Sequence, residues 1–283
     1  MQPSNVQTFK LGLIGYPLGH SLSPKIHTAA LKACGLEGDY SLFPIHPDNK
    51  QGLKGLLARV RSGEITGLNV TIPHKQSVIE LMDELTPTAK AIGAVNTICL
   101  QDEELIGDNT DALGFLRDLN RFLDVTQLKI ENRKSAIVMG AGGSARAVVY
   151  ALLNDGWKVT IAARRIEQAQ QLASYFEGVR AVELNFQTFQ LSNQQLIVNT
   201  TPLGMTPNVD QSPLPESLSL PSNAFIYDLV YNPRETKLVR DAHSKGLNAT
   251  TGLGMLIEQA ALAFEMWTGH NPPRDIMYTS VVE

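Results

Sequence analysis

A lysine follows a short strand-like stretch, GLNVTIPHK, at residues 67–75 of this 283-residue chain. The stretch is rich in β-branched and short polar residues, which suit an extended segment, and Pro73 cannot donate to a sheet ladder. The sequence therefore predicts a strand that ends near Pro73 and presents Lys75 beyond its end. An ammonium group in such a place can deliver a proton to a new alkoxide, or remove one from an alcohol once it is deprotonated. Lysine mostly occupies solvated surfaces, so its position alone does not establish this chemistry.

Other polar side chains fall at predicted strand ends and in loops. Each has a structural alternative, because serines before a proline suit a helix cap, an asparagine can hold a turn and an aspartate can begin a helix. Together they place hydroxyl, amide and carboxylate groups where substrate contacts are expected. His74 is expected to pack instead of react, since adjacent residues at a strand end point apart. The candidates beside Lys75 are Ser21, Ser23, Asn69, Thr71, Asn96 and Asp111.

A glycine-rich turn at residues 140–145 lies between a predicted strand and a predicted helix. The motif by itself is a weak signal, but in this context it is typical of dinucleotide binding. The first glycine permits a tight turn, the second lets a pyrophosphate approach the backbone, and the helix N-terminus supplies N–H groups and a positive dipole end. The alternative is a purely structural turn. The residues assigned to this loop are Gly140, Ala141, Gly142, Gly143 and Ser144.

The dinucleotide is predicted to be NADP(H), because the next strand ends in Ala163, Arg164 and Arg165 with no acidic residue. NAD-specific proteins hold the ribose 2′-hydroxyl with an acidic residue at about this distance from the glycine loop. A guanidinium can instead bind a 2′-phosphate through two hydrogen bonds and stack on adenine. The alternative is a pair of solvated surface arginines.

Alternating strand and helix patterns place these residues on an α/β fold of two lobes. The first lobe is predicted to contain a largely parallel sheet, and the segment after Pro272 is expected to be a short tail. The polar segment 124–134 is interpreted as a junction. The predicted strands cover residues 11–14, 39–45, 65–72, 95–100, 135–139, 157–165, 196–201 and 224–231, and the longest predicted helices cover 24–36, 48–63, 111–123, 237–247 and 254–269.

Composition excludes several classes of function. The chain is 43% hydrophobic and 18% charged, which allows a sizeable core. Its net charge of −4 and pI of about 5.9 do not support a nucleic-acid or anionic-membrane surface. Cys34 and Cys99 are far apart and are expected to be reduced thiols, and no histidine spacing suggests a metal site. Without a secretory leader or an apolar run of about 18 residues, the expected location is the cytoplasm.

Taken in order, these motifs resemble the shikimate dehydrogenase family, whose members interconvert 3-dehydroshikimate and shikimate with NADP(H). The resemblance covers nearly the whole chain, and several of its motifs are specific to the family, although the glycine loop is not. It rests on GYPLGHSLSP at 15–24, NVTIPHK at 69–75, GAVNTI at 93–98, GDNTD at 107–111, GAGGSARA at 140–147, NTTPLGM at 199–205, YDLVYNPRET at 227–236 and TGLGMLIEQAALAFEMWTG at 251–269.

The resemblance implies a role for each matching residue. Lys75 would be the general acid/base and Asp111 its carboxylate partner, which mainly orients Lys75 and a substrate hydroxyl. Ser21 and Ser23 would donate to the substrate carboxylate. Further substrate contacts would come from Asn69, Thr71, Asn96, Tyr231 and Gln259, and the nicotinamide would be lined by Leu229, Gly252 and Met255.

The same resemblance implies an activity and a domain organisation. The activity is the reversible NADPH-dependent reduction of 3-dehydroshikimate to shikimate in chorismate and aromatic amino acid biosynthesis. A substrate-binding domain would comprise residues 1–111, completed by 252–283, and a Rossmann-like NADP-binding domain would comprise 112–251. Such a protein would act as a monomer or homodimer on a small-molecule substrate, with no nucleic-acid or membrane partner.

Two alternatives remain open. The first is a quinate/shikimate dehydrogenase that uses NAD, against which stand the paired serines and the missing acidic residue. The second is a non-catalytic sensor of nucleotide and ligand, against which stands the presence of both Lys75 and Asp111. The Ala163-Arg164-Arg165 strand end also departs from the Asn-Arg-Thr of many NADP-type members, which leaves the strength of 2′-phosphate binding open.

Overall fold

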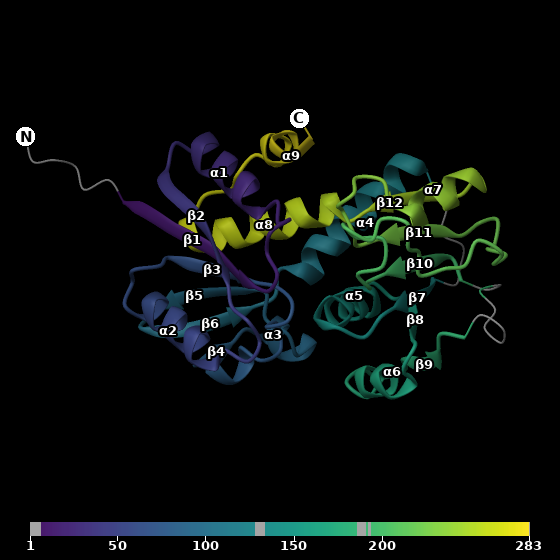
Figure 1. The fold of residues 1–283 in the computed structure, drawn as a ribbon, viewed down its shortest axis with the longest axis horizontal. Helices are drawn as coiled ribbons and strands as arrows, with labels where there is room; N and C mark the ends of the chain where they lie inside the picture. Colours follow the sequence, from purple (N-terminus) through teal and green to yellow (C-terminus); the bar gives the residue numbers. More distant parts are fainter. Residues whose placement is uncertain (1–6, 128–133, 186–190, 192–193, 283) are drawn as a thin grey trace, which may run out of the picture. The chain divides into compact units, whose positions relative to one another are not determined.

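The computed structural model describes residues 7–127, 134–185, 191 and 194–282. It divides into two compact units, one comprising residues 1–110 and 257–283 and the other residues 111–256. Each unit is built from its own six-stranded sheet with helices packed against it (Figure 1). The α/β fold of two lobes predicted from the sequence is therefore confirmed.

The sheet of the first unit has the strand order β2-β1-β3-β5-β6-β4. Strand β1 pairs in parallel with β2 and β3, and β4 pairs in parallel with β6, whereas β5 is antiparallel to both β3 and β6. The sheet is thus mixed. Its strands are β1 (Thr8–Gly15), β2 (Glu37–Pro44), β3 (Gly67–Val70), β4 (Glu84–Leu85), β5 (Thr97–Gln101) and β6 (Glu104–Asp108).

The first sheet is largely parallel, as predicted, because β1, β2, β3, β4 and β6 run in the same direction. Only β5 runs the other way, and the sequence patterns did not predict the β5–β6 hairpin that reverses it. The hairpin turns through Asp102 and Glu103, whose φ angles of 49° and 67° are left-handed. Two-residue hairpin turns favour this conformation at both positions, and Asn-Gly or Asp-Gly is their usual sequence signal. The pair Asp-Glu lacks the glycine, so the residue types contain no clear signal for the turn.

Helices cover both faces of the first sheet (Figure 1). The segment after Pro272, expected to be a short tail, instead forms α9, which packs against α1. Pro24 lies in the first turn of α1, as its position in the sequence predicted. The helices are α1 (Ser23–Ala33), α2 (Lys50–Arg61), the 3-10 turn η1 (Ile79–Leu81), α3 (Pro87–Ile92), the part of α8 (Leu253–Thr268) from residue 257 onward, and α9 (Arg274–Val282).

Strand β3 shows how the side-chain alternation of a strand separates the core from the candidate site. Leu68 and Val70 belong to the hydrophobic cluster that includes α2. The Asn69 side chain and the Cα hydrogen of Gly67 lie on the opposite face, since successive strand residues point to opposite sides. A Cβ atom at Gly67 would overlap the indole ring of Trp267. The α8 segment can therefore lie close to the sheet only where β3 has no side chain.

The second unit contains an all-parallel sheet in the order β12-β11-β10-β7-β8-β9. The order runs outward in both directions from β7 and β10, as in doubly wound dinucleotide-binding folds. Helix α4 takes in part of the expected junction, and residues 128–133 lie outside the described chain. The elements are α4 (Asp111–Thr126), β7 (Ser135–Met139), α5 (Gly143–Asn154), β8 (Lys158–Ala163), α6 (Ile166–Ala173), β9 (Arg180–Glu183), β10 (Leu196–Asn199), β11 (Phe225–Asp228), α7 (Lys237–Ser244) and β12 (Asn248–Thr251).

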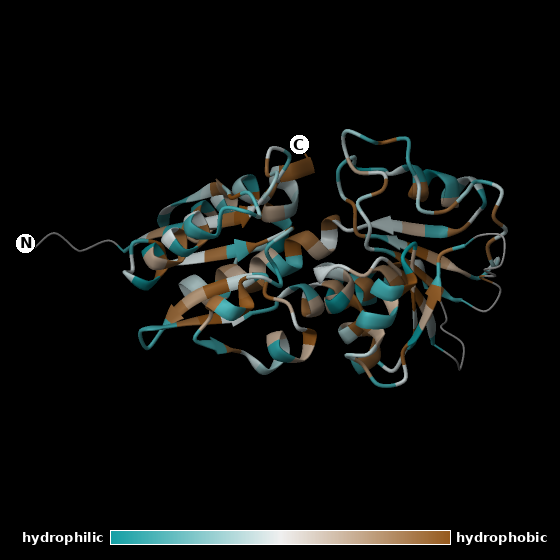
Figure 2. Ribbon diagram, turned by 60° about the horizontal axis from the view of Figure 1, so that its bottom comes forward, coloured by the Kyte–Doolittle hydropathy of each residue, from teal (hydrophilic) through white to brown (hydrophobic). Residues whose placement is uncertain are grey.

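Buried side chains on the two faces of this second sheet join it to different helices. On one face, the Tyr227 hydroxyl donates to the Asp118 carboxylate of α4 at 2.5 Å. On the other, Ile226 and Leu238 of α7 share a hydrophobic cluster. Hydrophobic residues gather in the strands and helices of each unit (Figure 2). In the described part of the chain, no helix is both long enough and apolar enough to span a membrane.

The close approach of α8 to β3 predicts opposite effects for two glycine substitutions. Gly67→Ala should destabilise the protein by about 1–3 kcal/mol, because the new methyl group must displace the Trp267 ring. The control Gly55→Ala, in α2 where a Cβ meets nothing within 4 Å, should stabilise it by about 0.5–1 kcal/mol. Thermal unfolding followed by circular dichroism measures both, and equal midpoints for the two variants would contradict the packing described.

Candidate functional site

Several predicted site residues of the first unit lie along one edge of its sheet. The carboxyl ends of β1, β3 and β6 and the amino end of β5 reach this edge, because β5 runs against its neighbours. Main-chain hydrogen bonds continue the pairing beyond the strands: Thr71 N–H donates to Ile14 O at 2.8 Å, Val70 N–H to Asn96 O at 2.8 Å, and Asn96 N–H to Asp108 O at 3.0 Å. The loops that follow β3 and β6 are therefore held beside the segment that precedes β5.

The side chain of Asn96 is the centre of a buried polar network at this edge. Its Oδ1 accepts from the Thr110 N–H at 2.8 Å and from the Thr97 hydroxyl at 3.1 Å. Its Nδ2 donates to the Thr110 hydroxyl at 2.9 Å and to Gln259 Oε1 at 3.3 Å. All four residues are buried. The structure thus brings Asn96 and Gln259 together, although they are far apart in the sequence.

Asn69 lies beside this network. Its Oδ1 accepts from the Tyr40 hydroxyl at 2.8 Å. Its Nδ2 donates at 3.3 Å to Asn96 O and, at the same distance, to the Thr97 hydroxyl. Thr97, Thr110 and Tyr40 were not among the predicted site residues. Thr97 and Thr110 are parts of the GAVNTI and GDNTD motifs, so the motifs contained a signal for them, whereas nothing in the sequence pointed to Tyr40.

Lys75 follows β3 in a turn, and its carbonyl accepts from the Val95 N–H at 2.7 Å. Only 9% of the residue is exposed, which is unusual for lysine. His74 is 2% exposed, and its Nε2 donates to Ile45 O at 2.7 Å. Its ring is therefore engaged with the main chain inside the unit, which agrees with the packing role expected from the sequence. Thr71 is partly buried at the end of the strand.

Ser21 and Ser23 lie at the start of α1. The Ser23 N–H donates to Ser21 Oγ at 3.3 Å, which brings the two serines into one turn. Ser23 is buried and Ser21 is partly buried. The N-cap position is Leu22, whose side chain cannot accept a hydrogen bond from the helix. The positive end of the helix dipole therefore lies beside two hydroxyl groups, an arrangement suited to a carboxylate ligand.

Asp111 is the first residue of α4 and of the second unit, and it is 4% exposed. The residue before it, Thr110, is fixed to the Asn96 amide by two hydrogen bonds. The chain therefore leaves the first unit directly from the polar network. A negative charge in the first turn of a helix is also favoured by the helix dipole.

The glycine turn of the second unit has the geometry expected for a phosphate cradle. Gly140 has a φ of +113°, and a Cβ there would lie 2.5 Å from the Thr200 hydroxyl. Gly142 is the N-cap residue of α5, and a Cβ there would meet nothing within 4 Å. A side chain at Gly142 would thus occupy open space in front of the helix N-terminus, where a pyrophosphate would lie. Ala141, Gly143 and Ser144 complete the turn between β7 and α5. These residues fit a bound dinucleotide.

The strand end with two arginines lies next to this turn. The Gly140 N–H donates to Ala162 O at 2.9 Å, which joins the turn to β8. Ala163 ends β8, Arg164 is exposed, and Arg165 is the exposed N-cap residue of α6. Both guanidinium groups are therefore carried at the carboxyl edge of the sheet beside the glycine turn.

A buried aspartate connects the loops that follow β10 and β11. Asp228 is fully buried and accepts from Asn199 Nδ2 at 2.8 Å, from the Thr236 hydroxyl at 2.6 Å and from the Val230 N–H at 3.1 Å. Asn199 in turn accepts from the Thr201 N–H at 2.9 Å. Burial raises the pKa of Asp228 to about 6, although the hydrogen bonds oppose that shift. Asp228 and Asn199 were not among the predicted site residues.

The residues expected at the nicotinamide lie near this connection. The Leu229 N–H donates to Asn199 O at 2.9 Å. A Cβ at Gly252 would overlap the carbonyl of Leu229, so these two segments are in close main-chain contact. Met255 is 6% exposed in the first turn of α8. Tyr231 is partly buried, and desolvation raises the pKa of its hydroxyl.

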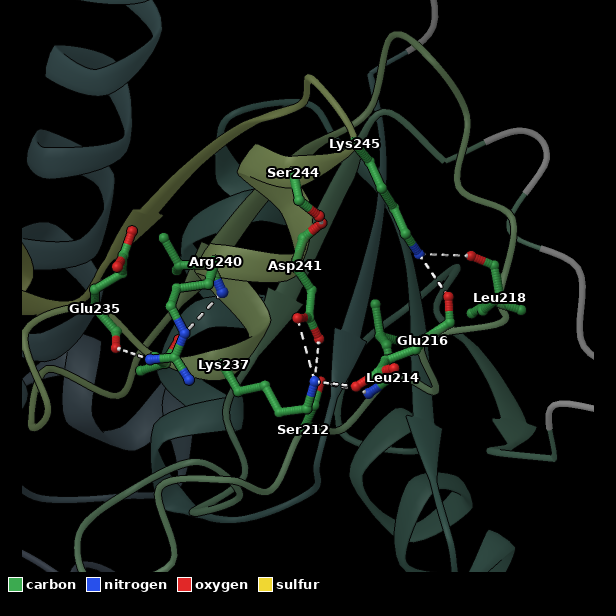
Figure 3. Close-up of polar contacts among 12 residues, drawn as sticks. Ser212, Leu214, Glu216, Leu218, Glu235, Lys237, Arg240, Asp241, Ser244 and Lys245 are labelled. Carbon is green, nitrogen blue, oxygen red and sulfur yellow. Dashed lines mark hydrogen bonds and ion pairs between the residues drawn. The ribbon is translucent and has the colours of Figure 1, made fainter.

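A cluster of charged side chains beside α7 is structural, despite a small cavity there (Figure 3). Lys237 Nζ lies 2.5 Å from Glu216 and 2.9 Å from Asp241, and Lys245 Nζ donates to Glu216 O at 2.9 Å and to Leu218 O at 3.2 Å. The cavity has a volume of about 10 Å³, room for about one water molecule. The cluster therefore holds Glu216 and Leu218 against α7 and its C-cap residue Lys245. No group of three or more His, Cys, Asp or Glu in the described residues could hold a metal ion.

Comparison with known proteins identifies the family. Models of the shikimate dehydrogenase substrate binding domain, of shikimate/quinate 5-dehydrogenase and of the shikimate 5'-dehydrogenase C-terminal domain match residues 13–98, 124–243 and 252–281. A shikimate dehydrogenase (NADP(+)) of Carboxydothermus hydrogenoformans is 41% identical over 98% of both chains. The chain belongs to the shikimate dehydrogenase family. The resemblance drawn from the sequence motifs is thereby confirmed.

Solved structures of the family have the same fold as this chain. Shikimate 5-dehydrogenase from Thermus thermophilus, in complex with NADP(H) and shikimate, is 38% identical, with a TM-score of 0.84 over 96% of this chain and 98% of that one. A quinate dehydrogenase from Corynebacterium glutamicum, in complex with NAD, is 32% identical, with a TM-score of 0.85 over 96% and 98%.

The buried carboxyl group of Asp228 predicts a pH-dependent difference in stability. Its folded-state pKa of about 6 exceeds the ordinary value of 3.8, so the folded protein holds this proton more tightly than the unfolded chain. The stability contributed by this group is present below about pH 4 and is lost as the pH rises through about 6. Relative to Asp228→Asn, the wild type should lose about 2 kcal/mol between pH 4 and pH 7.

Urea unfolding of both proteins across this pH range measures that difference. Asp39→Asn, at an exposed carboxylate in β2, controls for the loss of one negative charge. A difference between the wild type and Asp228→Asn that stays constant with pH would contradict the shift.

Proposed function

We propose that this chain catalyses the reversible NADPH-dependent reduction of 3-dehydroshikimate to shikimate, a step of chorismate and aromatic amino acid biosynthesis. The observation that carries the proposal is the nearly complete burial of Lys75 at the sheet edge where Asn69, Asn96 and Gln259 also meet. The proposal is supported by the identity of about 40% with NADP-dependent shikimate dehydrogenases over nearly the whole chain.

The first unit is proposed to bind the substrate. Ser21 and Ser23, beside the N-terminus of α1, would donate hydrogen bonds to its carboxylate. The amide and hydroxyl groups at the sheet edge would satisfy the ring hydroxyls and the reacting oxygen. The proposed substrate contacts are Asn69, Thr71, Asn96 and Gln259 from this unit and Tyr231 from the loop after β11.

Lys75 is proposed to transfer the proton and Asp111 to orient it. In the reductive direction, the Lys75 ammonium gives a proton to the carbonyl oxygen of the substrate. In the oxidative direction, the neutral amine accepts the proton of the hydroxyl group. Bound NADPH supplies the hydride. Asp111 would hold the ammonium and a substrate hydroxyl in position, and the attachment of Thr110 to Asn96 supports this because it fixes the chain next to Asp111.

The carboxyl edge of the second sheet is proposed to bind NADP(H). The residues of the glycine turn would hold the pyrophosphate at the start of α5. Ala163, Arg164 and Arg165 would bind the adenine-ribose end, with the guanidinium groups at the 2′-phosphate. Leu229, Gly252 and Met255 would line the nicotinamide, and the contact between Gly252 and Leu229 supports that grouping.

A quinate dehydrogenase that uses NAD is the second candidate function. The similarity to a quinate dehydrogenase crystallised with NAD favours it. The two arginines at the end of β8 and the serine pair oppose it.

The proposed setting is the cytoplasm, with the chain acting as a monomer or homodimer and without a nucleic-acid, membrane or metal partner.

Loss of the proposed acid/base should abolish most of the activity. We expect the wild type to oxidise shikimate with NADP⁺, and Lys75→Ala to lower kcat by about 10²–10⁴-fold, the usual contribution of a positioned proton-transfer group. Nicotinamide absorbance measures the rate, and Lys90→Ala at an exposed position is the control.

Three outcomes of that assay would count against the proposal. A preference for quinate with NAD⁺ would establish the second candidate. If the protein binds substrate and nucleotide but turns over neither shikimate with NADP⁺ nor quinate with NAD⁺, it is a sensor. Unchanged kcat in Lys75→Ala would remove that residue from the chemistry.

The arginines at the end of β8 predict a selective change in nucleotide binding. Arg164→Ser should weaken NADPH binding by about 10–100-fold, because a charged hydrogen-bond partner of the 2′-phosphate is lost. The dissociation constant of NADH should change less than about threefold. Arg165→Ser is tested in parallel, and Arg180→Ser, at the opposite end of the neighbouring strand β9, is the control. Nucleotide fluorescence titration without substrate gives both constants, and parallel loss of NADPH and NADH binding would contradict the assignment.

A further inference from the structure

Behind Asn69 lies a pair of stacked rings that the proposed mechanism does not use. The ring of His27, from α1, is parallel to the ring of Tyr40, from β2, with centroids 4.3 Å apart and an interplanar angle of 5°. Trp267, from α8, lies 5.5 Å from the His27 ring. The two rings therefore join three elements of the first unit on the side of the sheet that Asn69 faces.

The polar edge of this pair meets the Asn69 side chain. The Tyr40 hydroxyl donates to Asn69 Oδ1 at 2.8 Å. His27 is fully buried, and burial lowers its pKa to about 3, a shift that the Asn69 side chain opposes. The imidazole is therefore neutral at physiological pH and stacks on Tyr40 without introducing a charge.

The hydrogen bond from Tyr40 is the shortest contact of the Asn69 amide. Two further contacts, from Nδ2 to Asn96 O and to the Thr97 hydroxyl, are 3.3 Å long, and the His27 ring also interacts with the Asn69 side chain. An asparagine side chain rotates readily about its terminal bond, so two long contacts on one end leave the plane of the amide loosely defined. A third contact on the opposite end fixes that plane and decides which lone pair of Oδ1 is directed away from Tyr40.

We propose that Tyr40, held in place by the His27 ring, is a positioning residue that orients the Asn69 amide toward one hydroxyl group of the substrate ring. The proposal rests on the function proposed above. Tyr40 is 8% exposed and its hydroxyl is occupied by Asn69, so it acts through Asn69 and does not contact the substrate. Substrate discrimination then depends on a residue that contacts Asn69 and not the ligand.

Tyr40→Phe tests this role because it removes the hydroxyl and keeps the ring in its stack. We expect the KM for shikimate to rise about 3- to 10-fold, as for the loss of one hydrogen bond, with kcat and the KM for NADP⁺ changed less than twofold. His27→Phe, which keeps a ring but removes the imidazole, serves as a second variant, with a smaller rise expected. Tyr278→Phe, at an exposed tyrosine of α9, is the matched control.

Analogues of shikimate that each lack one ring hydroxyl distinguish positioning from a general structural effect. With the analogue that lacks the hydroxyl bound by Asn69, Tyr40→Phe and the wild type should have the same KM. With the other analogues, the 3- to 10-fold difference should remain. Calorimetric titration of each ligand gives the same comparison at equilibrium, and thermal unfolding shows whether the variants are folded.

Each outcome decides between the two proposals. If the wild type turns over shikimate and Tyr40→Phe has an unchanged KM, the inference about Tyr40 is wrong and the proposed function stands. The inference is also wrong if the variant loses the same factor with every analogue, because that pattern indicates a structural role. A wild type without activity on any substrate pair overturns the proposed function and this inference with it.

Discussion

The candidate substrate site depends on the orientation of one buried amide, that of Asn96. Its oxygen accepts and its nitrogen donates, and the partners come from the start of β5, the end of β6 and helix α8. Because the two ends of an amide are chemically different, only one orientation satisfies all these partners at once. A buried polar group that loses its partner costs about 1–3 kcal/mol. The network therefore defines both the local structure and the direction in which the remaining polar atoms point.

The second unit uses a carboxyl group for a similar purpose. Asp228 accepts hydrogen bonds from the Asn199 amide at the end of β10 and from the Thr236 hydroxyl and the Val230 N–H after β11. Burying a carboxylate is costly, and the raised pKa reflects that cost, which the three donors only partly offset. A buried carboxylate at residue 228 is consistent with a requirement for a defined course of these loops, at some cost in stability. Leu229, which is expected to line the nicotinamide, follows Asp228 directly in the chain.

The sequence predicted the parts of the fold that depend on short-range patterns. The β-branched stretch that ends near Pro73 is β3, and the glycine turn lies between β7 and α5 as its spacing indicated. The β5–β6 hairpin was missed because its turn lacks glycine, and α9 was missed because the segment after Pro272 shows weak helical periodicity. The hairpin depends on an unusual local turn, and α9 depends on packing against α1, a distant part of the chain.

The candidate site also contains residues that the sequence identified and residues that only the fold reveals. Residues with distinctive chemistry, such as Lys75, stood out in the sequence, and the structure buries them. Tyr40 could not be found in this way, since a tyrosine in a strand is ordinary and only the fold shows its hydroxyl against Asn69. Thr97 and Thr110 were present in recognised motifs, but their partners become evident only when β5 and β6 are paired.

The continuity of α8 has a consequence for how this chain can vary through evolution. Met255, proposed to face the nicotinamide, and Gln259, proposed to face the substrate, lie four positions apart on a single helix. Side chains with this spacing project from the same face, about 6 Å apart along the axis. Inserting or deleting one residue between them would rotate one side chain by about 100° relative to the other. Homologous sequences should therefore tolerate substitutions in this turn but no change in its length.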